Sequence, residues 1–194
     1  MISTELVKNL RDKTGLSIMQ CKKALEEAGG DLDKAIVILQ KQSGDVASKK
    51  SDRNLGSGAI QSYIHGTGAV GAIVELSCET DFVAKNEEFK AIAYDLAMQV
   101  AATDPQFLKM EDITPEAKKS AESVFTDEIQ GKPEDLKAKI LEGKLNSYFA
   151  EQTLVEQAFI KNPELKIKDL ISGATQKFGE RIEIRRFVRF STQS

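Results

Sequence analysis

Apolar residues in the first part of the chain recur at steps of three and four, the spacing of one face of an α-helix. The pattern predicts three short helices within residues 4–42. Ser17 and Gln20 form a capping box at the start of the second helix, and Gly29-Gly30 ends it. About forty residues bury only a thin core, so we expect this module to dock on another surface. Its expected inward positions are Leu6, Val7, Leu10, Ile18, Cys21, Leu25, Ala28, Leu32, Ala35, Ile36 and Leu39.

After Gly58 the period changes to two, the period of a β-strand. Apolar positions alternate along residues 60–64 and along residues 70–78, and the turn Gly66-Thr67-Gly68 separates the two runs. This arrangement predicts a β-hairpin with one apolar face. A further strand is expected over residues 181–190, with a bulge at Arg185-Arg186 where the alternation changes phase.

Helical periodicity fills the chain between the hairpin and the last strand. Asn86 is the expected N-cap of the first of these helices, and Thr114-Pro115 starts the next. The last helix covers residues 165–178 and ends at Gly179. A hairpin, a run of helices and a returning strand imply an α+β fold, in which helices cover a roughly three-stranded antiparallel sheet.

Composition changes along the chain in a way that predicts its division. Residues 43–57 are rich in Ser, Gly and Lys, which favours a linker, although a short basic helix within them is an alternative. We therefore expect a helical module at 1–42, a linker at 43–57 and a core domain at 58–194.

Scarce residue types exclude several classes of protein. Among 194 residues there are one histidine, His65, and two cysteines, Cys21 and Cys78, which is too few for a zinc cluster or a disulfide framework. The longest apolar run, residues 35–39, is far shorter than the roughly 20 residues that span a bilayer. We expect an intracellular, cytoplasmic protein with no membrane contact and no cofactor.

Charge is distributed unevenly. Residues 1–56 carry 10 basic and 8 acidic groups, residues 57–160 carry 9 and 18, and residues 161–194 carry 8 and 4. These are net charges of +2, −9 and +4, which favour contact with a folded protein over direct binding of nucleic acid.

No convincing catalytic group emerges from the motifs. The chain has no glycine-rich phosphate-binding motif and no GxSxG motif. His65 lies at the expected end of a strand, and a general base there would need a partner and a pocket. We interpret it as a structural or interface histidine. A small metabolic enzyme that uses His65 is the weaker alternative.

One segment, residues 80–86, carries apolar side chains without periodicity. Phe82 and Val83 lie on an expected strand-to-helix connection, between Cys78 and Asn86. Phe82 either tucks back over the sheet edge or, beside Asp81, protrudes as an anchor for a partner protein.

Four motifs, in this order, resemble those of the elongation factor Ts family of bacteria and organelles. They are residues 10–25, with the family's ubiquitin-associated-like pattern, residues 62–66, residues 78–86 and residues 179–186. The resemblance covers nearly the whole chain. Arg181 departs from it, because the family often has a small polar residue there.

The resemblance implies a guanine-nucleotide exchange factor whose partner is elongation factor Tu. Asp81 and Phe82 would insert between helices of that GTPase and disturb its Mg²⁺ site, so that GDP is released. The short form of the family implies a homodimer formed through the core domain, a 2:2 complex, and a helical insertion around 114–150. Further implied partner contacts are Thr80, Val83, Lys22, His65, Phe178 and Gly179. A module that docks on ribosomal or nascent-chain partners without exchange activity is the alternative.

Overall fold

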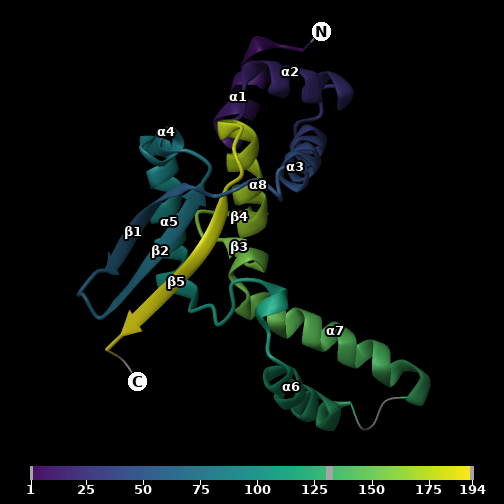
Figure 1. The fold of residues 1–194 in the computed structure, drawn as a ribbon. Coiled ribbons are helices and arrows are strands. Elements are labelled where there is room, and N and C mark those ends of the chain that lie inside the picture. Colours follow the sequence, from purple (N-terminus) through teal and green to yellow (C-terminus); the bar gives the residue numbers. More distant parts are fainter. Residues whose placement is uncertain (1, 130–132, 193–194) are drawn as a thin grey trace.

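The structure is a computed structural model that describes residues 2–129 and 133–192, and it confirms the α+β class. The chain begins with α1 (Thr4–Thr14), α2 (Ile18–Glu27) and α3 (Leu32–Lys49), which lie together at one end of the molecule (Figure 1). The Ser17 capping box is present, with Ser17 N–H donating to Gln20 Oε1 at 3.0 Å. Cys21 is fully buried in the core of this module, as the periodicity predicted.

Helix α3 continues seven residues past the predicted end at 42, so residues 43–49, the first part of the predicted linker, are helical, as the alternative interpretation of this stretch allowed. The reason is tertiary, because this stretch packs along α8 (Ile167–Phe178). Ser43 is buried there, and its hydroxyl lies within hydrogen-bonding distance of Leu39 O and Gln176 Oε1. Ser and Gly have low helix propensity, but burial against a neighbouring helix outweighs it.

The core domain contains a three-stranded antiparallel sheet in the order β1 (Ser57–His65), β2 (Val70–Cys78) and β5 (Glu183–Ser191). The predicted bulge is confirmed. Glu75 pairs with Arg186 and Leu76 pairs with Ile184, so Arg185 has no partner across the ladder. Helix α5 (Glu87–Thr103), capped by Asn86 as predicted, covers β1 and β2.

The prediction of a hairpin with one apolar face is wrong. The register places Ile60 opposite Glu75 and Ile64 opposite Gly71, whereas Val74 and Leu76 face α5 and are fully buried. The outer face of the sheet is therefore apolar as well. Its exposed large apolar side chains are Ile60, Ile64, Ile73, Val188 and Phe190.

The middle of the chain forms a pair of helices that projects from the sheet domain (Figure 1). α6 (Pro115–Glu128) is capped by Thr114, as predicted, and α7 (Glu134–Gln152) returns beside it. This pair has a small core of its own around Ile113, Ala121 and Phe149. The remaining elements are α4 (Asp81–Ala84), η1 (Met110–Asp112), η2 (Leu154–Glu156), β3 (Ala158–Phe159) and β4 (Asn162–Lys166).

The β3–β4 hairpin, which the sequence pattern did not predict, is held by one buried side chain. Gln99 on α5 is fully buried, and its amide nitrogen donates to Gln157 Oε1 and to Ala158 O, both at 3.1 Å. Its amide oxygen accepts from Ile160 N–H at 2.9 Å. A two-residue strand such as β3 is too short to show a period, so only the tertiary contact reveals it.

We expect Gln99→Leu to lower the free energy of unfolding by about 2–4 kcal/mol, because it leaves buried polar groups of the hairpin without partners. Urea denaturation measures this change. The control is Gln106→Leu, which alters an exposed amide that donates to Asp104 O. Equal stability of the two variants would contradict the structural role of Gln99.

Candidate partner-binding site

The corner segment, residues 80–86, is a single helical turn followed at once by the start of α5. Thr80 caps the turn, and its hydroxyl accepts from Val83 N–H at 3.4 Å. Asn86 caps α5 by accepting from Glu88 N–H at 2.8 Å. Two successive capped helix starts give this connection a defined shape where the sequence predicted only a loop between strand and helix.

Phe82 protrudes from this corner. Its side chain is 80% exposed, whereas Val83 and Ala84 beside it are buried in the main core. The alternative that Phe82 tucks back over the sheet is therefore wrong. Val83 supports the corner from inside, so its side chain is not a surface contact in this structure.

Asp81 presents a negative charge beside the exposed ring. Its carboxylate accepts a hydrogen bond from Lys85 Nζ at 2.6 Å, and both side chains are largely exposed. The hydrogen bond and the charge of Lys85 hold the pKa of Asp81 below its ordinary value, so it is ionised at neutral pH. An exposed aromatic ring beside a fixed charge has the chemistry of an interface anchor.

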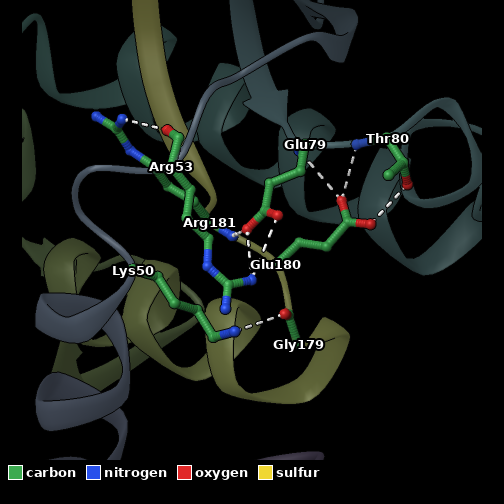
Figure 2. A network of polar contacts seen from close by, with 7 residues as sticks. All are labelled: Lys50, Arg53, Glu79, Thr80, Gly179, Glu180 and Arg181. Atoms are coloured by element: carbon green, nitrogen blue, oxygen red, sulfur yellow. Dashed lines mark hydrogen bonds and ion pairs between the residues drawn. The ribbon is translucent and has the colours of Figure 1, made fainter.

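A network of polar contacts joins the base of the corner segment to the turn between α8 and β5 (Figure 2). Glu180 Oε2 accepts from the N–H groups of Glu79 and Thr80 at 3.1 and 3.0 Å, and its Oε1 accepts from the Thr80 hydroxyl at 2.6 Å. Glu79 in turn accepts from Arg181 N–H at 2.6 Å, a hydrogen bond that holds the pKa of Glu79 below its ordinary value.

The residues of this network other than Thr80 and Gly179 were not predicted as site residues. Glu180 and Arg181 lie in a matched motif, which was the available signal.

The segment that follows α3 also enters this network. Lys50 Nζ donates to Gly179 O at 2.7 Å, and Arg53 pairs with Glu79 at 3.3 Å. Arg181, the departure from the family pattern, donates through its guanidinium to Arg53 O at 2.7 Å. The end of the N-terminal module and the base of the corner segment are thus connected through the same few residues.

His65 lies at the opposite end of the β1–β2 hairpin. Eight ladder positions separate it from Ser57, the partner of Cys78, which puts it on the order of 25 Å from the corner segment. Its Nδ1 is 3.0 Å from the Tyr63 hydroxyl, and Tyr63 packs edge-on against Tyr94. In the part of the chain that the structure describes, no carboxylate orients this imidazole as a general base would require.

The other predicted contacts lie on separate surfaces. Lys22 is exposed on α2 and forms an ion pair with Glu26 at 3.9 Å, near the exposed Ile18 and Met19. Phe178 is half-buried and packs edge-on against Phe89 in the core, so its ring supports the site from behind. Gly179 ends α8 with φ 72° and leads directly into Glu180.

We expect Cys78, which ends β2 just before the corner segment, to resist alkylation by iodoacetamide at pH 8 in the folded protein. Burial raises the pKa of this thiol to about 11, so about one thiol in a thousand is ionised at that pH. Mass spectrometry should show modification only after unfolding in urea. Fast labelling of the folded chain would contradict the packing at the base of the corner.

None of the described helices is long and apolar enough to cross a membrane. A family model described as Elongation factor TS matches residues 46–194. A protein named elongation factor Ts from Thermodesulfovibrio yellowstonii is 50% identical over 190 residues, which are 97% of this chain and 95% of that protein. The protein of that name from Thermosipho melanesiensis is 47% identical over 98% of both chains, and that from Carboxydothermus hydrogenoformans is 46% identical over 98% of this chain and 88% of its own.

These matches extend over nearly the whole chain at 46–50% identity, and the family model spans the core domain together with the corner segment and its polar network. The chain belongs to the elongation factor Ts family.

Proposed function

We propose that this protein is a guanine-nucleotide exchange factor that binds elongation factor Tu in the cytoplasm, where translation takes place, and accelerates release of GDP. The observation that carries the proposal is Phe82, 80% exposed on a doubly capped corner beside the ionised Asp81. An aromatic ring that is held on a fixed corner beside a charge has the features of an interface anchor, which supports a role in a complex.

The corner segment would enter between helices of the GTPase nucleotide domain and displace groups that hold Mg²⁺ and GDP there. By linkage, the factor weakens GDP binding by the same ratio by which GDP weakens binding of the factor. Each tenfold weakening requires about 1.4 kcal/mol of interaction made only with the open GTPase. Burial of one phenylalanine supplies about this amount or more, and no catalytic residue is required.

Other exposed groups would provide the affinity that brings the corner to its site. Lys22, with Ile18 and Met19 beside it, gives the N-terminal module a mixed basic and apolar surface. His65 and the backbone at Gly179 would add contacts at two further points. Separate patches of different charge suit a folded partner with a complementary surface.

We also propose that the protein forms a homodimer through the outer face of the sheet, which gives a 2:2 complex. Ile60 and Ile64 on β1 and Phe190 on β5 are each more than 60% exposed on this face. Glu75 pairs with Arg186 on the same face at 2.6 Å, so the charge of this carboxylate already has a partner on its own chain. An apolar face of this kind is unfavourable in contact with water. Burial against the same face of a second copy would remove it from water.

We expect Phe82→Ala to slow stimulated GDP release from elongation factor Tu by about 30-fold, the loss of an interface anchor worth about 2 kcal/mol, without changing the fold. Stopped-flow release of a fluorescent GDP analogue measures the rate. Val124→Ala, which truncates another exposed apolar side chain on α6, is the control and should behave as wild type. Wild-type rates for Phe82→Ala would refute the proposed role of the corner.

For the dimer, we expect Ile64→Lys to convert the protein to a monomer at micromolar concentration, because a charge would face the apolar partner surface. Analytical ultracentrifugation measures the mass. Val124→Lys on α6 is the matched control and should leave the mass unchanged. A wild-type protein that is already monomeric would contradict the proposal.

A further inference from the structure

Val83 and Ala84 fix the corner segment to the main core from inside, but its first residues and Phe82 lie at the surface. The helical turn of α4 has four residues, and a single turn does not form stably in water without tertiary support. Phe82 is exposed, and the pair between Asp81 and Lys85 lies on the surface, where such pairs contribute little. Contacts from outside the turn are therefore needed, beside the buried Val83 and Ala84, to fix its N-terminal end.

The Glu180 carboxylate lies against the residues that lead into α4, where it can fix the start of the turn. It binds two consecutive backbone N–H groups, of Glu79 and Thr80, and the Thr80 hydroxyl with three hydrogen bonds of 2.6–3.1 Å. The Thr80 hydroxyl donates to Glu180 and keeps its lone pairs for Val83 N–H, so the cap of α4 and the contact with Glu180 reinforce each other. Hydrogen bonds to a carboxylate are roughly twice as strong as those between neutral groups.

Glu180 is itself fixed from the other side. It follows Gly179, whose left-handed backbone ends α8, and Lys50 Nζ donates to the Gly179 carbonyl. The next residue, Arg181, donates its N–H to the Glu79 carboxylate at 2.6 Å. The Glu180 side chain thus accepts from the backbone of Glu79, and the Glu79 side chain accepts from the backbone of Arg181, about a hundred residues away in the sequence. Figure 2 shows these contacts side by side.

We propose that Glu180 is a positioning residue for nucleotide exchange, holding Thr80 and thereby the turn that presents Asp81 and Phe82. The inference rests on the proposed function. An anchor that is already oriented loses less conformational freedom on binding, so Glu180 contributes to exchange without touching the GTPase.

The first test measures the free protein and does not depend on the partner. In Glu180→Ala, hydrogen exchange of the Glu79 and Thr80 amides should accelerate by about tenfold or more, as expected for a lost hydrogen bond to a charged group. Glu180→Gln should give an intermediate value, because its amide retains one oxygen for the two N–H groups and a donor for Thr80. Glu151→Gln on α7 is an exposed control. Unchanged exchange in Glu180→Ala would overturn the proposal.

The second test is a double-mutant cycle on GDP release from elongation factor Tu. Glu180→Ala should slow release by about fivefold to thirtyfold in the wild-type background, with Glu180→Gln less affected, and should have little effect when Phe82 is already alanine. Equal effects in both backgrounds would mean that Glu180 acts independently of the corner, and would overturn the inference.

The cycle also separates the two proposals. If elongation factor Tu releases GDP at the wild-type rate in the presence of Phe82→Ala, the proposed function of the corner fails. If GDP release is slow with Phe82→Ala but proceeds at the wild-type rate with Glu180→Ala, the proposed function stands and the positioning role of Glu180 fails.

Discussion

The arrangement of this protein depends on the pairing of β2, the central strand, with β1 on one side and β5 on the other. The register of these two ladders buries Val74 and Leu76 against α5 and turns Ile60 and Ile64 outward. It also places the corner segment at one end of β2 and His65 beside Val70 at the other end. A slip of one residue would reverse both faces of the strand, so the core and the outer apolar face are set by the same constraint.

Large apolar side chains are exposed at the corner with Phe82, on the outer face of the sheet, and at the start of α2 with Met19. Each lies on a well-defined element, and the corner is tied to the body by hydrogen bonds to Glu180. The exchange activity that we propose would need this combination, because it depends on contacts with one state of the partner that are not made with the other. Rigid presentation reduces the entropy lost when those contacts form.

Much of the fold could be predicted because its signals are local. The capping box at Ser17, the cap at Asn86 and the bulge beside Arg185 depend on residues only a few positions apart, and the structure confirms all three. The motif of residues 78–86 could likewise be found, since its members are contiguous. The β3–β4 hairpin was missed, because β3, with two residues, is too short for a period and Gln99, which holds the hairpin, lies about sixty residues away.

The sequence alone determined the long helices and most of their ends, the three strands of the main sheet, the family, and the candidate pair Asp81-Phe82. The tertiary structure decided that Phe82 points into solvent and that α3 continues along α8. It also decided that the isoleucines of β1 face outward and that Glu180 is hydrogen-bonded to Thr80. Periodicity and capping act over one or two turns of chain, whereas these outcomes depend on residues that meet only after folding. A side chain such as Glu180 has no local signature, because its hydrogen-bond partners lie a hundred positions away.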